Sequence, residues 1–135
     1  MTTYRGPPKG SASEPYFAEV ECPIHHVIMR CSSTRYGFRH SCPIQDCTMA
    51  CWDGPTSLPA DAPTRGMRHK AHSVFDALWK GRGKGKRDIL YRRLAKELGI
   101  DSKACHMGMF DSATCKRVIK IAHGWCHASR HSKRA

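Results

Sequence analysis

Residues 22–47 read CPIHHVIMRCSSTRYGFRHSCPIQDC, and this stretch decides how the first half of the chain folds. Its interior holds two short β-like pieces, residues 27–31 and 36–40, separated by the polar residues 32–35. Two such pieces around a polar break predict a β-hairpin. A Cys-Pro turn stands at each end of the stretch, so we expect the hairpin to bring both turns to one end of a small lobe.

The two turns carry thiol and imidazole groups at metal-ligand spacing. Cys22 and His25 form the pattern C-x2-H, and Cys42 and Cys47 form the pattern C-x4-C. Zinc prefers four tetrahedral nitrogen or sulfur ligands, and a small lobe gains much of its folding free energy by closing that tetrahedron. The sequence therefore predicts one Zn²⁺ held by these four side chains. The alternative is a set of free buried thiols, which leaves the repeated Cys-Pro turns unexplained.

Other cysteines and histidines compete for places in this site. The competitors are His26, Cys31, His40 and Cys51. Cys31 lies inside a predicted strand, where a free cysteine more often packs as a small apolar side chain. Cys51 is close enough to Cys47 in sequence to replace it. The choice among these residues stays open at the level of sequence.

The second half of the chain contains three apolar patterns with helical spacing. The first begins at Thr64 as N-cap and runs to Gly81, and the second covers residues 88–98 and ends at Gly99. The third begins at Asp111 or Ser112 and ends before residue 124. The inward side of the first helix is formed by Met67, Ala71, Val74, Phe75 and Leu78. We expect Trp79 to close the bundle near Cys105 and His106.

These patterns predict an α+β fold, with a small zinc-ribbon-like β-hairpin lobe packed with about three short α-helices. The expected order is a flexible N-terminal arm (1–16), the zinc-ribbon-like lobe (17–52), a connector (53–64), a basic helical part (65–124) and a basic tail (125–135). A length of 135 residues fits one compact domain.

The first residues contain no apolar signal segment, and no run approaches the roughly 18 apolar residues of a membrane span. We therefore expect a cytoplasmic protein with no membrane partner. In a reducing compartment thiols persist, so the eight cysteines favour metal binding over disulfides.

Positive charge is confined to the second half of the chain. Residues 1–60 hold five Lys or Arg and five Asp or Glu, which cancel, whereas residues 61–135 hold eighteen against six and carry the whole excess of +12. A concentrated positive field attracts polyanions, and DNA and RNA are the common ones in a cytoplasm. The alternative is a surface that only keeps the protein soluble.

The segment KGRGKGKR at residues 80–87 concentrates this charge. Glycine lets a backbone approach a phosphate closely, and unpaired Lys and Arg bind phosphates without reading sequence. The predicted nucleic-acid-binding residues are Lys80, Arg82, Lys84, Lys86, Arg87, Arg92, Arg93 and Lys96. A solvated linker is the alternative interpretation.

Several further motifs stand in a fixed order along the chain. They are CP at 22–23, YG at 36–37, Cys42, Cys47, RHKAHSVFDALW at 68–79, Tyr91 with LA at 94–95, and CHMGMFD at 105–111 up to Cys115. Together these motifs resemble the zinc-finger-containing domain family of phages and prophages. The resemblance spans roughly residues 20–122. It implies a zinc-ribbon-like lobe fused to helices in a phage-type accessory protein of the host cytoplasm, without implying a particular reaction. His25 stands where the family usually has a second cysteine, and the usual Gly-x-His after the last cysteine is missing.

Two other functions are compatible with the sequence. A metal-dependent nuclease would use His72, Asp76 and His106 beside the basic segment, and a second metal or catalytic site would draw on His72, Cys105, His106 and Cys115. Cys115 falls on an apolar stripe, however, and no motif identifies a nucleophile. A protein-binding effector that captures a host enzyme or ribosome is the other alternative. No element matches a base-reading module, so sequence-specific binding is not expected.

Overall fold

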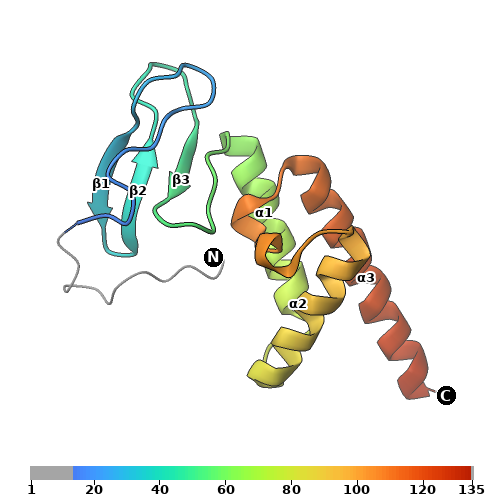
Figure 1. Cartoon of the computed structure of the whole chain (residues 1–135). Coiled ribbons are helices and arrows are strands. Elements are labelled where there is room, and N and C mark those ends of the chain that lie inside the picture. Colours follow the sequence, from blue (N-terminus) through green and yellow to red (C-terminus); the bar gives the residue numbers. More distant parts are fainter. Residues whose placement is uncertain (1–13, 135) are drawn as a thin grey trace.

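The computed structural model describes residues 14–134, so most of the predicted N-terminal arm, residues 1–13, lies outside the described residues. A small antiparallel sheet occupies the first half of this range, and three helices with two short 3-10 turns occupy the second (Figure 1). This arrangement confirms the predicted α+β fold. None of the helices in the described part of the chain has the length and apolar character that a membrane crossing needs.

The sheet has three antiparallel strands in the order β1-β2-β3, namely β1 (Arg30–Thr34), β2 (Gly37–Ser41) and β3 (Ala50–Trp52). The hairpin exists as predicted, but β1 begins three residues later than expected. The reason is that Val27 and Ile28 pair with the segment that precedes them instead of with β2. The Cys22 N–H donates to the Val27 carbonyl at 2.9 Å, and Ile28 forms an antiparallel bridge with Glu21. Strand β3 was not predicted, because three residues are too few to show an alternating pattern.

Helix α1 (Ala62–Asp76) begins and ends earlier than the sequence indicated. Its N-cap is Asp61 rather than Thr64, and the Asp61 carboxylate accepts a hydrogen bond from the Thr64 N–H at 2.9 Å. Pro63 stands in the first turn, where its missing N–H costs nothing. The predicted connector 53–64 therefore ends at Asp61.

Helix α2 (Lys84–Leu98) starts four residues before the predicted boundary, so half of the supposed basic loop is helical. Gly83 is its N-cap with φ 91°, and Gly99 closes it in the left-handed conformation, as predicted.

Helix α3 (Ser112–Arg134) does not stop before Gly124, and it continues through most of the predicted tail. A glycine inside a helix costs about 1 kcal/mol. Packing beyond it offsets this cost, because the Trp125 ring lies 6.3 Å from the Phe75 ring and contacts the helical core.

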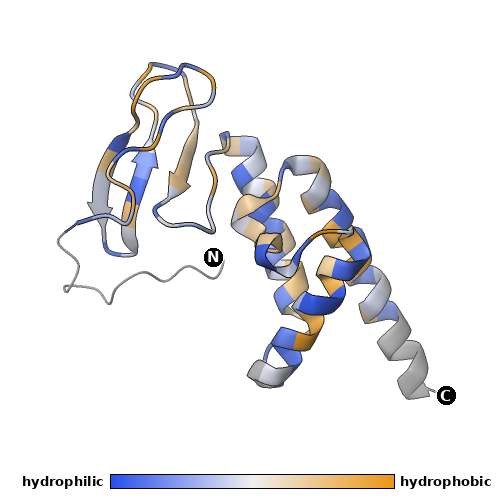
Figure 2. Cartoon of the chain, in the orientation of Figure 1, coloured by the Kyte–Doolittle hydropathy of each residue, from blue (hydrophilic) through white to orange (hydrophobic). Residues whose placement is uncertain are grey.

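The main core lies between the three helices. The apolar faces of α1, α2 and α3 turn toward one another, and their outer faces are polar (Figure 2). Phe75 and Ala71 on the predicted inner side of α1 are fully buried, and Met67, Val74 and Leu78 pack against them. A second, much smaller cluster in the sheet lobe consists of Cys22, Met29, Met49 and Cys51.

Arginines of α1 fasten the two parts of the molecule together. Arg68 donates from Nε to the Phe110 carbonyl and from Nη1 to the Leu58 carbonyl, both at 2.7 Å. Arg65 donates from Nη2 to the Thr48 carbonyl at 2.8 Å. The bonds to Thr48 and Leu58 thus tie the sheet lobe and the loop after it to α1.

We predict that Phe75→Ala lowers the free energy of unfolding by about 3–5 kcal/mol, because its ring is fully enclosed by α2 and α3. Urea unfolding followed by helical circular dichroism measures this loss. Ile89→Ala is the control, since Ile89 lies on α2 and is 53% exposed, and its effect should stay within about 0.5 kcal/mol. Equal effects of the two changes would show that this side of α1 is not core.

Candidate metal centre

The four predicted ligands lie together at one end of the sheet lobe. The ligand atoms of Cys22, His25, Cys42 and Cys47 are all within 4.8 Å of one another. The Cys22 Sγ lies 3.9 Å from the His25 Nδ1 and 3.9 Å from the Cys47 Sγ, and the Cys42 Sγ lies 3.7 Å from the same Nδ1. The hairpin therefore does bring the two turns into contact.

Local hydrogen bonds shape each turn. In the first, the His26 N–H donates to the Cys22 carbonyl at 2.9 Å, and His26 takes a left-handed conformation with φ 57°. In the second, the Cys47 N–H donates to the Ile44 carbonyl at 3.1 Å, and Asp46 has φ 68°. A left-handed residue reverses the chain sharply, and aspartate tolerates it better than most side chains do. The two extra residues of C-x4-C are accommodated by this second reversal.

The spacing of the donors fits a tetrahedral ion. Metal–ligand bonds of about 2.0–2.3 Å place tetrahedral ligand atoms roughly 3.5–3.8 Å apart. Three of the six separations between ligand atoms, at 3.7–3.9 Å, match this edge length, and all six stay within 4.8 Å, so a small contraction would close the tetrahedron. Three thiols and one imidazole also form a donor set that structural zinc sites use.

The electrostatics of Cys22 favour a thiolate. Burial alone would raise its pKa, but the backbone N–H groups of His25 and Ile24 and the His25 ring outweigh it and lower the pKa to about 6. The pKa of Cys42 is instead raised, by burial and by the neighbouring thiols of Cys47 and Cys22. The lowered pKa of Cys22 favours one thiolate in the cluster, and a bound cation would favour ionisation of the remaining thiols.

The four competitors stand outside this group of ligand atoms. His26 is exposed and pairs with Glu21 at 3.0 Å. Cys31 is also exposed, on β1, and partial desolvation of its thiol together with the negative charge of Asp53 raises its pKa. Cys51 is buried in β3, and burial raises its pKa to about 11, so its thiol stays protonated at neutral pH.

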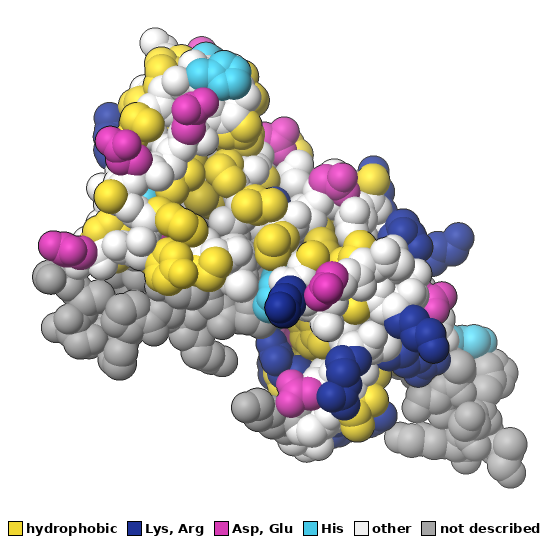
Figure 3. Space-filling view, viewed as in Figure 1, with side chains coloured by type: hydrophobic (Ala, Val, Ile, Leu, Met, Phe, Trp, Pro, Cys, Tyr) yellow, Lys and Arg dark blue, Asp and Glu magenta, His cyan; other side chains and the backbone are white. Residues whose placement is uncertain are grey.

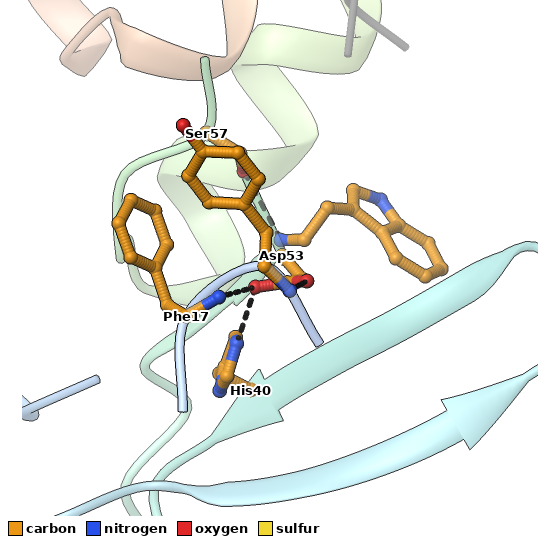
Figure 4. Close-up of polar contacts among 6 residues, drawn as sticks. Phe17, His40, Asp53 and Ser57 are labelled. Atoms are coloured by element: carbon orange, nitrogen blue, oxygen red, sulfur yellow. Dashed lines mark hydrogen bonds and ion pairs between the residues drawn. The ribbon is translucent and has the colours of Figure 1, made fainter. Parts of the chain in front are cut away.

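The fourth competitor, His40, belongs to a buried polar network in the sheet (Figure 4). His40 is fully buried, and its Nε2 donates to the Asp53 carboxylate at 3.0 Å. The same carboxylate accepts from the backbone N–H groups of Tyr16 and Phe17. His40 and Asp53 therefore hold the segment before the first turn against the sheet, a role that sequence reasoning missed.

The residues considered for a second site do not form a second metal-ligand cluster among the described side chains. There, Cys22, His25, Cys42 and Cys47 are the only group of three or more His, Cys, Asp or Glu side chains close enough to hold a metal. Burial raises the pKa of both Cys105 and Cys115 to about 11, and both belong to the helical core. His72 pairs with Asp76 at 3.0 Å on α1.

The predicted nucleic-acid-binding residues lie on the turn before α2 and along α2 itself. Lys80, Arg82 and Lys86 are exposed, as are Arg92, Arg93 and Lys96. On the face drawn in Figure 3, most Lys and Arg side chains gather over the helices, whereas the sheet lobe is mainly apolar with scattered acidic groups. The asymmetry of charge along the sequence therefore persists in space.

Sequence reasoning also missed a group of arginines between the two parts of the molecule. Arg39 on β2 lines a cavity together with Arg65 and Arg68 on α1. The i, i+3 spacing of Arg65 and Arg68 indicated a shared helix face, but nothing in the sequence placed Arg39 opposite them.

We predict that the purified protein carries one tightly bound metal ion per chain and that Cys42→Ala loses it. A site with three remaining ligands forfeits much of the binding free energy, so the sheet lobe should unfold as well. Elemental analysis and thermal melting measure both effects. Cys31→Ala is the matched control, because it removes an exposed thiol of the same lobe and should leave metal content unchanged. Equal metal content in the two variants would contradict the assignment.

Comparison with known proteins identifies a family for most of the chain. The zinc-finger-containing domain matches residues 26–124. The match begins directly after His25, so it includes Cys42 and Cys47 but not the first pair of ligands, and it is shifted at both ends from the expected 20–122. Searches among curated proteins and among solved structures found no significant match. Since the match covers most of the chain, the protein belongs to the zinc-finger-containing domain family.

Proposed function

We propose that the protein is a phage-type accessory protein that uses a structural zinc ion to fold its sheet lobe and binds DNA or RNA through the electrostatic field of its helices. The observation that carries the proposal is the separation of a metal-ligating lobe without net charge from a helical part that holds the whole excess of +12. Binding is expected to show little sequence preference.

The zinc ion in this proposal has a structural role. Three cysteines and one histidine would complete a four-coordinate shell, whereas catalytic zinc sites keep a position open for water or substrate. The sheet lobe has only four residues in its buried apolar cluster, which is too few to hold it without further support. A metal that closes the two turns supplies that support.

The start of α2 favours anion binding for two reasons. First, Lys84, Lys86 and Arg87 lie in its opening residues, where no acidic side chain stands in the first turn. The free backbone N–H groups and the positive end of the helix dipole lie at this same end of α2. Second, the cations repel that dipole, so a phosphate would relieve an unfavourable arrangement within the protein.

Aromatic rings orient two of the arginines on this surface. The Arg87 guanidinium lies 4.8 Å from the Tyr91 ring centroid and 5.6 Å from that of Trp79. The Arg93 guanidinium lies 4.1 Å from the Trp125 centroid. Stacking against a ring limits the motion of an arginine while its edge donors still reach outward. These arginines would therefore lose less conformational entropy on meeting a phosphate.

We predict that Lys84→Ala combined with Lys86→Ala flattens the dependence of log affinity on log salt by up to about 1.8 for duplex DNA, if each lysine meets one phosphate. Fluorescence anisotropy with labelled duplexes between low and moderate salt measures the slope. The melting temperature should not fall, because alanine is a good helix former and the change removes repulsion at the helix start. Arg87 is left in place because its ring contacts make it part of the packing.

The matched control removes two cations from the sheet lobe, Arg30→Ala with Arg35→Ala, and changes the net charge equally. Its salt dependence should stay close to that of the parent protein. If both double variants behave alike, only overall charge matters, and the α2 surface is not a binding site. If neither variant nor parent binds DNA or RNA, the protein-binding effector becomes the better explanation.

A further inference from the structure

A cavity of about 470 Å³ lies where the sheet lobe meets the helices. Its sheet side includes Arg39, Trp52 and Ser57, and its helix side includes Arg65, Arg68 and His72. The sheet-side residues come from β2, β3 and the loop after β3, and the helix-side residues come from α1, which Figure 1 shows beside that loop. The volume falls within the range of small-molecule sites, roughly 300–1,000 Å³.

The cavity carries an excess of positive charge. Three arginines line it, and none of them forms an ion pair with a carboxylate among the described residues. The only acidic side chain in the lining, Asp76, is paired with His72 at 3.0 Å. Asp61 and Asp111 lie nearby and attract Arg68 at longer range. Burial, and after it the positive charge of Arg65, lowers the pKa of Arg39.

Much of the hydrogen-bonding capacity of these arginines is unused. Arg65 donates from Nε and Nη2 and Arg68 from Nε and Nη1, in each case to backbone carbonyls. Carbonyl oxygens carry no net charge, so both guanidinium groups keep theirs, together with the rest of their five N–H groups. Arg39 has no hydrogen-bond acceptor in the described part of the chain and is held only by its stacking on the Trp52 ring at 4.9 Å.

We propose that this cavity binds the phosphate group of a nucleotide, with Arg39 as the main phosphate ligand and Arg65 and Arg68 completing the positive field. Guanidinium forks match the geometry of phosphate oxygens and bind them in pairs. His69 and His72 in the lining provide flat rings of the kind that bases contact, across from the Trp52 ring on which Arg39 stacks. The nucleotide is either free or the phosphorylated end of a strand. The site is separate from the α2 surface and does not rest on the nucleic-acid binding proposed above.

Isothermal titration of the metal-loaded protein with AMP, adenosine and inorganic phosphate tests the proposal. AMP should bind, and adenosine and inorganic phosphate should each bind at least about tenfold more weakly, since each lacks half of the contacts. Equal affinity for AMP and adenosine would overturn the phosphate site. Equal affinity for AMP and inorganic phosphate would overturn the assignment to a nucleotide.

Arg39→Gln should weaken AMP binding by about tenfold to a hundredfold, as expected for loss of a charged hydrogen-bonding partner. Arg35→Gln is a closely matched control: it lies on the same hairpin, stacks on Tyr36 at 5.1 Å, and does not line the cavity. It should leave AMP affinity unchanged. Arg39→Lys, which keeps the charge but loses the fork, should give an intermediate affinity and serves if the glutamine variant fails to fold. Equal AMP affinity in the Arg39 and Arg35 variants would overturn the proposal.

Two further experiments identify the source of the phosphate and distinguish binding in the cavity from binding on α2. A 5′-phosphorylated oligonucleotide that competes with AMP better than its 5′-hydroxyl counterpart would identify the end of a strand as the ligand. Equal, weak competition by both oligonucleotides would identify a free nucleotide. Lys84→Ala with Lys86→Ala should leave AMP affinity unchanged even if it abolishes duplex binding. An equal loss of AMP affinity in that double variant would show that AMP binds on α2 and would overturn the cavity site.

Discussion

The convergence of two Cys-Pro turns on one set of four ligand atoms is the constraint on which the first half of the molecule depends. The sheet has one three-residue strand and a buried apolar cluster of only four residues. Such a lobe buries little apolar surface, and the conformational entropy of ordering its loops opposes folding. Hydrogen bonds within each turn aim the ligands, and the buried His40–Asp53 pair holds the preceding segment in place. The proposed metal would join these local features into one structure.

The second half is held by ordinary hydrophobic packing, so the two parts of the molecule are stabilised by different forces. Hydrogen bonds from Arg65 to the Ala60 and Thr48 carbonyls and from Arg68 to the Leu58 carbonyl cross their junction. Arginine suits this role because it can donate in several directions and keep its charge. The same two residues line the cavity, so the contacts that fasten the lobe also create a positive field between the parts. Loss of the metal should therefore disturb the cavity, although no metal ligand lines it.

Sequence patterns predicted element types well and boundaries less well. The prediction of the buried side of α1 was correct because helical spacing of apolar residues is a strong signal over four turns. The prediction that α2 ends at Gly99 was correct because that cap requires a left-handed residue. The start of α2 was wrong because glycines in KGRGKGKR indicated a loop, whereas Gly83 caps the helix and Gly85 lies inside it. The end of α3 was wrong because Gly124 indicated a stop, yet the packing of Trp125 on Phe75 carries the helix onward.

The sequence by itself determined the fold class, the four candidate metal ligands and the confinement of net charge to the second half, because each of these follows from local spacing or composition. Only the tertiary structure decided which of the neighbouring cysteines and histidines lie outside the metal-ligand cluster. Cys51 and His40 are as close in sequence to the ligands as the ligands are to one another, but pairing within the sheet directs them into the lobe interior. The cavity likewise depends on Arg39 facing Arg65 and Arg68 across the junction, and such a meeting of distant segments is set by packing rather than by any local pattern.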